Sequence, residues 1–152
     1  MVKRRSLAED PCPVARSLDL VGDWWTLLIV RNALSGTRRF SDFQKALGIS
    51  KSMLAERLQK MVQDGLLEIR PDPEGSAYSE YHLTEKGRRL LVVLMALRQW
   101  GEGNLFEPGE AMNVLTDARD GAPARRLELL SADGRVLEQD DIRIVRGKAG
   151  GV

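Results

Sequence analysis

The sequence predicts a mainly α-helical chain of the α+β class, with one small β-hairpin set among helices. Apolar residues recur at spacings of three and four in successive segments between residues 13 and 64, which is typical of amphipathic helices. Two short β-type segments, residues 66–70 and 78–83, then flank a stretch rich in proline, aspartate and glycine. A final helical segment follows. This order is typical of a winged helix-turn-helix, so we expect that domain over residues 10–103.

The first two helices are predicted from their start signals and apolar faces. Asp10–Pro13 indicates a helix start, because proline is favoured at the first helical position. Val14, Leu18 and Val21 then share one face. Asp23 is the expected N-cap of the second helix. The buried side of that helix should carry Trp25, Leu28, Ile29 and Ala33.

The third and fourth helices form the predicted helix-turn-helix. Ser41 and Gln44 have the spacing of a capping box, which predicts a short helix that starts at Ser41 and stops at Gly48. After this tight turn, Ser50 is the expected N-cap of a helix over residues 51–64. Its apolar face should carry Leu54, Leu58, Met61 and Val62.

The last helix is expected to run unbroken from a cap at Thr84 to about Gly101. Residues 90–97 are apolar in a row, so this helix is hydrophobic on all sides, and one small domain can cover only one of them. We therefore expect a two-fold homodimer that uses residues 13–21 and 88–106. The alternative is that the C-terminal part of the same chain covers this helix.

Residues 105–147 differ in composition and predict a small β-hairpin appendage. Asp120–Gly121 and Asp133–Gly134 are turn signals between short apolar segments. A structural zinc site needs cysteine or histidine ligands, and the sequence has neither from residue 104 onward. We expect no metal in this segment.

Composition narrows the function classes. Hydrophobic residues make up 43% and charged residues 30% of the 152, as in ordinary globular proteins. No apolar run reaches the roughly 18 residues of a membrane span, and no apolar segment follows the basic residues 1–5, so we expect a cytoplasmic protein without a membrane partner. His82 is the only histidine, and no catalytic triad or phosphate-binding glycine loop is present. We expect neither an enzyme nor a cofactor.

The predicted fourth helix and the link before the third are the candidate DNA-binding surface. Residues 38–60 hold six basic and two acidic residues, a local excess of four positive charges. Serine and glutamine can read base edges, while arginine and lysine can contact guanine or phosphate. The candidate DNA-binding residues are Arg38, Arg39, Lys51, Ser52, Arg57, Gln59 and Lys60. The alternatives are a solvated charged face and a winged-helix protein-interaction module that binds no DNA.

Several motifs, in order and with matching gaps over about residues 10–103, resemble the HxlR-type regulators. They are Cys12–Ala15, Gly22–Ile29, Arg38–Phe43, Ile49–Ser50, Leu54, Arg57–Leu58, Asp64–Leu66, Glu80–Tyr81, Leu83–Thr84 and Lys86–Gly87. The resemblance implies a winged helix-turn-helix transcription factor that dimerises through its first and last helices, binds double-stranded DNA and, we expect, acts as a repressor. One departure is Gly75–Ser79, where family wings often carry Pro-Pro-Arg-Val, so we expect a weaker grip of the wing on DNA.

Cys12 is the redox-sensing candidate. Unpaired N–H groups and the helix dipole at a helix start favour a thiolate. The resemblance implies the same role, because some family members sense electrophiles or oxidants with the cysteine at this position; a small-molecule effector at the dimer interface is also open. A lone cysteine has no partner in its own chain, so we expect a mixed disulfide or adduct. The alternatives are an inert packed thiol and a thiol enzyme with His82 as its base.

Overall fold

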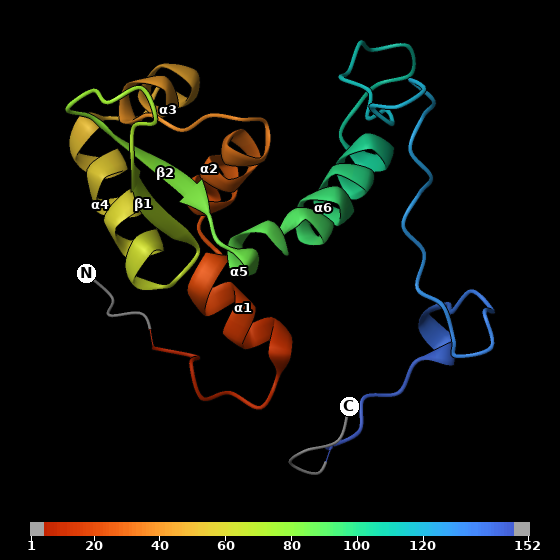
Figure 1. Ribbon diagram of the computed structural model, residues 1–152. Coiled ribbons are helices and arrows are strands. Elements are labelled where there is room, and N and C mark those ends of the chain that lie inside the picture. The colour runs from red at the N-terminus through yellow and green to blue at the C-terminus, as the bar shows by residue number, and fades with distance from the viewer. Residues whose placement is uncertain (1–4, 148–152) are drawn as a thin grey trace. The chain divides into compact units, whose positions relative to one another are not determined.

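The computed structural model describes residues 5–147, which form two compact units divided between Met95 and Ala96. Residues 1–4, which include Lys3 and Arg4, lie outside the described residues, so the expectation about a secretion signal stays a prediction. The first unit contains α1 (Pro13–Val21), α2 (Trp24–Leu34), α3 (Phe40–Leu47), α4 (Lys51–Gln63), β1 (Leu67–Pro71), β2 (Ser79–Leu83) and α5 (Glu85–Arg88) (Figure 1). The helix α6 (Leu91–Asn104) leads into the second unit, which also holds the short 3-10 helix η1 (Gln139–Asp141). The predicted α+β class and winged helix-turn-helix order are confirmed.

Side-chain caps fix the starts of α2 and α4 as the sequence predicted. The Asp23 carboxylate accepts a hydrogen bond from the backbone N–H of Thr26 at 3.0 Å and another from the Thr26 hydroxyl at 2.5 Å. The Ser50 hydroxyl accepts from the backbone N–H of Met53 at 3.3 Å. Between α3 and α4, Gly48 adopts a left-handed φ of 62°, which a residue with a Cβ adopts only with strain. These caps set the tight turn of the helix-turn-helix.

The predicted start of α3 at Ser41 is wrong by one residue. The backbone N–H groups of both Asp42 and Phe43 donate to the Arg39 carbonyl at 3.1 Å, so the first helical turn closes on Arg39. In the described part of the chain, no side-chain cap forms at this helix start. The cause lies outside the helix, because the N–H of Tyr81 in β2 donates to the Arg38 carbonyl at 2.8 Å and fixes the link against the hairpin.

One apolar core joins the helices of the first unit to the hairpin. Its largest fully buried side chains are Phe43, Ile29, Leu54, Leu58, Met61, Leu66, Leu67 and Val30. The strands pair antiparallel from Leu67 opposite Leu83 to Pro71 opposite Ser79, so that Leu67 and Leu83 enter the core together. Figure 1 shows the hairpin beside α4, which is the arrangement of a wing next to a recognition helix.

The predicted unbroken helix from Thr84 to Gly101 is wrong, because the chain turns at Arg89 and Leu90 between α5 and α6. Thr84 does cap the first of these helices, since its hydroxyl oxygen accepts from the N–H of Gly87 at 3.1 Å. The same hydroxyl donates to the carbonyl of Gly65 at 2.6 Å, which ties α5 to the end of α4. Leu90 packs against the core at the turn. The short α5 therefore belongs to the winged domain, and α6 starts afresh.

The second unit has turns but little regular structure. Antiparallel bridges join Thr116 to Pro123 and Leu130 to Val136, and they enclose the two predicted Asp-Gly turns. The predicted β-hairpin appendage thus has one isolated bridge around each turn, without a strand ladder in the described residues. The domain limits drawn from the sequence, residues 10–103 and 105–147, stay a prediction. Over residues 5–147, no helix combines the length and apolar character that crossing a membrane requires.

Replacement of Gly87 by alanine should destabilise the first unit. A Cβ at this position would lie 2.2 Å from the Leu66 carbonyl oxygen and 2.9 Å from Cδ2 of Leu83, so the backbone at the base of the wing must shift. We expect a loss of about 1–3 kcal/mol in the free energy of unfolding, measured by denaturant titration. The control is Gly101→Ala, whose Cβ would meet only Leu105 at 3.9 Å and should stabilise α6 by about 0.5–1 kcal/mol. Equal stability of the Gly87→Ala protein and the parent would contradict this account.

Candidate nucleic-acid interface

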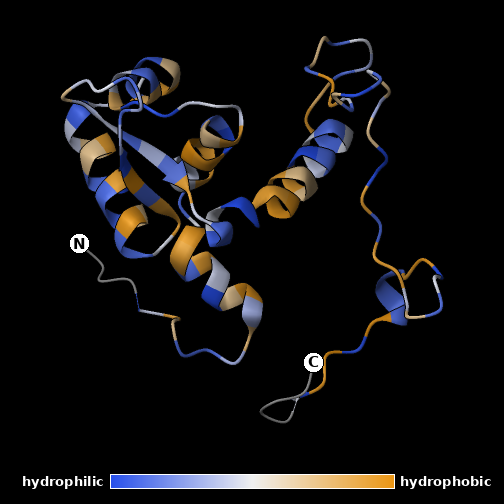
Figure 2. Ribbon diagram, viewed as in Figure 1, coloured by the Kyte–Doolittle hydropathy of each residue, from blue (hydrophilic) through white to orange (hydrophobic). Residues whose placement is uncertain are grey.

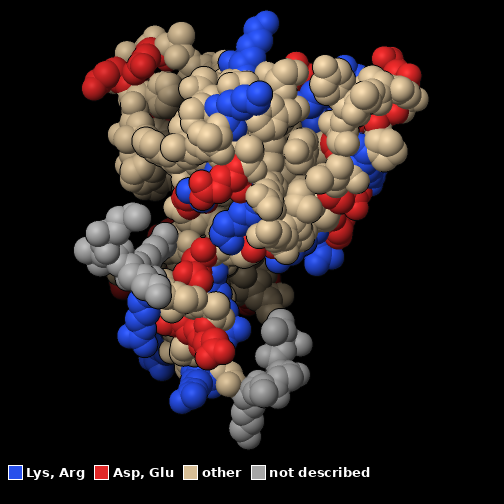
Figure 3. All heavy atoms as spheres, turned by 90° about the vertical axis from the view of Figure 1, so that its left-hand side faces the viewer, with Lys and Arg blue, Asp and Glu red and all other residues tan. Residues whose placement is uncertain are grey.

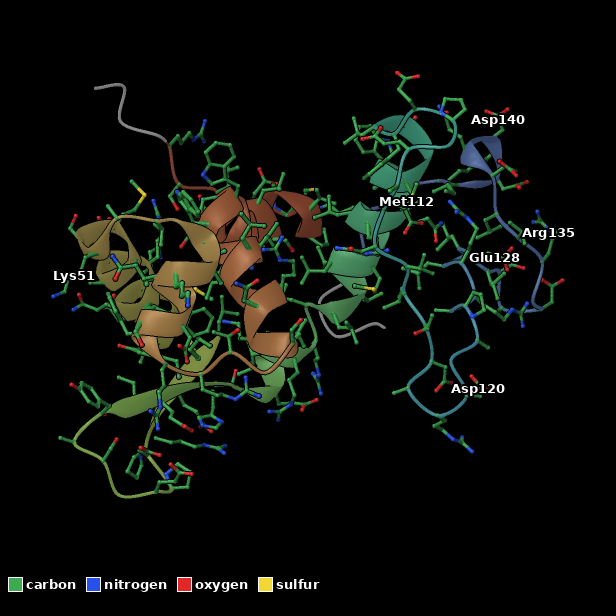
Figure 4. All side chains as sticks on the ribbon, turned by 90° about the horizontal axis from the view of Figure 1, so that it is seen from above. Lys51, Met112, Asp120, Glu128, Arg135 and Asp140 are labelled. Atoms are coloured by element: carbon green, nitrogen blue, oxygen red, sulfur yellow. The ribbon has the colours of Figure 1, made fainter. Side chains whose placement is uncertain are left out.

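The helix α4 has one buried and one exposed face. Leu54, Leu58 and Met61 lie in the core and fix the rotation of the helix. The opposite side presents Lys51, Ser52, Glu56, Gln59 and Lys60, all exposed. Figure 4 shows Lys51 projecting outward from the start of this helix. The rotation of α4 therefore leaves a polar face free for a partner.

Arg38 is engaged within the protein. Its Nη1 donates to the carbonyl oxygens of Ala33 at 2.6 Å and Thr37 at 2.9 Å. These carbonyls lie at and beyond the end of α2, where helical hydrogen bonds run out. Arg38 thus stabilises the end of α2, and its predicted contact with DNA would have to share the guanidinium with these carbonyls.

Arg39 is paired with a buried carboxylate of the wing turn. Its Nη2 lies 2.7 Å from Oδ2 of Asp72, whose side chain is only 1% exposed. Hydrogen bonds from Ser76 and from the backbone N–H of Glu74, together with the charge of Arg39, hold the pKa of Asp72 below its ordinary value of 3.8 despite burial. This pair fastens the wing turn to the link before α3.

Two further candidate cations are paired with acids that lie outside residues 38–60. Arg57 Nε lies 3.7 Å from Asp23, and Lys60 Nζ lies 2.8 Å from Asp64. Counting Asp23, Asp64 and Asp72 with the segment lowers its local charge from 6 − 2 = +4 to 6 − 5 = +1. Figure 3 shows the same mixing on the face that it displays, where Lys and Arg are interspersed with Asp and Glu. The excess of positive charge over residues 38–60 is therefore largely neutralised.

An open pocket of about 570 Å³ lies where the starts of α3 and α4 approach the wing. It is lined by Arg39, Phe40, Ser41, Lys51, Tyr78, Ser79 and Tyr81. Two cations and several hydroxyl groups in one hollow match the donors that proteins present to phosphate oxygens. Sequence reasoning missed Ser41, Tyr78 and Ser79, because only the fold brings the wing to the helix starts. The signal that was available is the group of hydroxyl residues at the end of the wing turn, Ser76, Tyr78 and Ser79.

Cys12 is the exposed N-cap residue of α1. Its backbone N–H donates to Oδ1 of Asp10 at 2.8 Å, while its thiol is not engaged in capping. The helix start predicted from the sequence is confirmed, and the alternative of a buried thiol does not fit the exposure. His82 is in the wing, with Nε2 2.8 Å from Oε2 of Glu80.

Apolar side chains are exposed along α1 and α6. On α1, Val14 and Leu18 are exposed, although Val21 is buried. The helix α6 contains no buried residue over Leu91–Asn104, and the first half of this helix is strongly apolar (Figure 2). Its exposed apolar residues are Leu91, Val92, Val93, Leu97 and Trp100, whereas Leu94 packs partly against the core. Both helices of the predicted dimer surface thus have apolar area without a cover.

Comparison with known proteins assigns the winged part of the chain. The HxlR-like helix-turn-helix family matches residues 20–108. The HTH-type transcriptional regulator Rv3095 of Mycobacterium tuberculosis is 43% identical over 95 residues, which are 62% of this chain and 60% of that protein. The match therefore spans less than two thirds of this relative. HTH-type YtfH of Escherichia coli is 36% identical over 107 residues, 70% of this chain and 85% of that protein. Neither is named as an enzyme, in agreement with our prediction.

Solved structures divide into longer and shorter relatives. The crystal structure of PA1607 is 44% identical, with a TM-score of 0.88, and the match covers 93% of this chain and 99% of that one. The oxidized form of the redox regulator HypR is 31% identical, with a TM-score of 0.55, and the match covers 61% of this chain and 97% of that one. Almost the whole of HypR thus corresponds to less than two thirds of this chain.

Proposed function

Because the chain belongs to the HxlR-like helix-turn-helix family, we propose that it binds duplex DNA as a homodimer and regulates transcription. The observation that carries the proposal is the exposed polar face of α4 beside the pocket lined by Arg39 and Lys51. A helix of this kind enters the major groove, with its first residues nearest the bases. Such binding to chromosomal DNA would take place in the cytoplasm.

The proposed contacts fall into two groups with different consequences. Lys51 would lie near the phosphates, together with the hydroxyl groups of the pocket and with Arg39, whose charge is partly offset by Asp72, and these groups would position the protein without reading sequence. Ser52 and Gln59 would reach base edges and give specificity. Arg57 and Lys60 are paired with acids and would contribute less than their charge suggests. Tyr78, which is 74% exposed in the wing, would take the part of the arginine that family wings often carry.

We propose a two-fold dimer through α1 and α6, with repression as its effect. Exposed apolar residues on both helices favour association, because burial of apolar area is its main driving force. A two-fold dimer also presents two copies of α4, which can read half-sites about one DNA turn, roughly 34 Å, apart. Occupation of such a site excludes other proteins from the same DNA, which is the simplest route to repression.

We also propose that Cys12 makes DNA binding sensitive to oxidants. Its exposure and its place at the start of a proposed dimer helix support this, as does the similarity to a protein named as a redox regulator. The Cys12 thiolate would attack a small disulfide, form a mixed disulfide and release one thiol. The added group at α1 would disturb the dimer and thereby the spacing of the two α4 helices.

Selection of bound duplexes from a random pool should return a palindromic site, and affinity for it should depend on α4. We expect Lys51→Ala to weaken binding to all sequences alike and to reduce the salt dependence by about one phosphate contact. Gln59→Ala should instead relax base preference, by about 1–3 kcal/mol at the affected position. Fluorescence anisotropy at several salt concentrations measures both. Arg119→Ala, outside the winged unit, is the control and should bind like the parent. A parent that enriches no duplex would favour the protein-interaction module instead.

Leu97→Glu should convert the dimer into a folded monomer. Leu97 is 51% exposed, so the charge is tolerated in a monomer but would be buried without a partner in the dimer, at a cost of several kcal/mol. Leu94 is a poorer choice, because it also packs against the core. Sedimentation measures the change, and Ile69→Glu, at a wing residue 55% exposed, is the matched control that should remain dimeric. If the parent itself sediments as a monomer at micromolar concentration, the dimer is disproved.

Treatment with diamide should abolish operator binding by the parent and leave the Cys12→Ser protein unaffected. The expected product is a mixed disulfide when a small thiol is present, which intact-mass spectrometry identifies by its added mass. A gel shift before and after reduction with dithiothreitol shows whether binding returns. The same response in both proteins, or in neither, would leave Cys12 without a sensing role.

A further inference from the structure

The C-terminal arm, residues 105–147, has a defined path but no core. Between residues 96 and 147 no side chain is buried. The large apolar side chains that the arm exposes are Leu105, Phe106, Met112, Val114, Leu115, Leu127, Leu129, Leu130, Val136, Ile142, Ile144 and Val145. Figure 4 shows Met112, Asp120, Glu128, Arg135 and Asp140 spread along the arm. A segment with so much apolar surface is not a solvated tail.

Polar side chains of α6 hold the arm in place within the second unit. The Gln99 amide makes two hydrogen bonds to the backbone of Leu127, donating to its carbonyl at 3.0 Å and accepting from its N–H at 2.8 Å. Arg98 donates to the carbonyl of Asn113. Turns closed by the two bridges complete the path. The arm is thus positioned by its own helix, yet it does not pack closely, because an open groove of about 490 Å³ separates α6 from residues 126–129.

These hydrogen bonds cannot order the arm without further burial. Each exposed hydrogen bond replaces one to water and contributes little net free energy, while ordering the backbone opposes folding at every residue. Burial of apolar area is the term that normally balances this, and no side chain of residues 96–147 is fully buried. A cover for the arm is therefore needed whenever the arm adopts this conformation.

We propose that the arm packs against a second copy of this chain, so that the two arms clasp the homodimer. The inference rests on the proposed dimer and adds a second contact region to α1 and α6. A surface that must always be covered needs a partner that is always present, and a second copy of this chain meets that condition. The arm also begins at the end of α6, so its contact continues the helix interface.

The charge of the arm argues against DNA as its partner. Residues 105–147 contain six Arg and nine Asp or Glu, a net charge of 6 − 9 = −3, which repels phosphate.

The relatives give a second argument for the clasp. The match to HypR covers 61% of this chain and 97% of that one, whereas the match to PA1607 covers 93% of this chain. The family match ends at residue 108, so most of the arm lies outside the part of the chain that the family shares, as expected for an added clasp that reinforces an interface.

Site-specific photocrosslinking between two tagged versions of the full chain tests the clasp. Benzophenone-alanine replaces one exposed arm residue, Leu129 or Ile144, in the first version only, and the two versions are co-expressed and irradiated. We expect a covalent product that carries both tags. The matched control places the same group at Tyr78 of the wing, which is also exposed and should give no such product without DNA. Gln99→Ala in the labelled chain should lower the yield, because it releases the arm from α6.

The outcomes separate the clasp from the dimer. A product with both tags from an arm position, absent from the wing position, supports the clasp. If the protein sediments as a dimer but the arm positions crosslink only within the labelled chain, or give no crosslink, the clasp is overturned and the dimer stands. A monomer by sedimentation overturns both. Using two arm positions guards against one substitution that disturbs folding, which circular dichroism of each variant detects.

Discussion

The contact between the end of α4 and the start of α5 holds the winged domain together. The Thr84 hydroxyl bonds the carbonyl of Gly65 and caps Gly87, and Gly87 lies so close to Leu66 that no side chain fits. Lys86 adds a hydrogen bond to the carbonyl of Asp64 at 2.7 Å. The start of β1 and the end of β2 both lie at this contact. The position of the hairpin beside the recognition helix, and hence the pocket between them, depends on it.

Ion pairs connect that frame to the candidate DNA surface. Arg39 is tied to the buried Asp72 of the wing turn, and Arg57 lies near Asp23, the cap of α2. These pairs orient the link and the helix, but they also remove positive charge from the surface. What remains for a partner is a modest set of polar and cationic groups around Lys51. In the proposed homodimer two copies of this modest surface would act on the DNA together, so affinity for DNA would depend on association.

The two units differ in how much apolar surface they bury. The winged domain buries its own core fully, whereas no side chain is fully buried over residues 96–147. The first unit has a core of its own, and in the proposed clasp the second unit would gain its burial from association. Redox control through Cys12 would act on the same region, since α1 is part of the proposed interface. In the proposed dimer, assembly and DNA binding would thus be coupled through α1 and α6.

The sequence by itself determined the order of the elements, the caps at Asp23 and Ser50, the turn at Gly48 and the buried face of α4, because these depend on neighbours within a few residues. Only the tertiary structure decided the start of α3 at Phe40, the break at Arg89 and Leu90, and the neutralisation of the positive charge over residues 38–60. Each of these arises from groups distant in sequence: a β2 N–H on Arg38, a core position for Leu90, and Asp72 of the wing on Arg39. The local sequence pattern does not reveal such pairings.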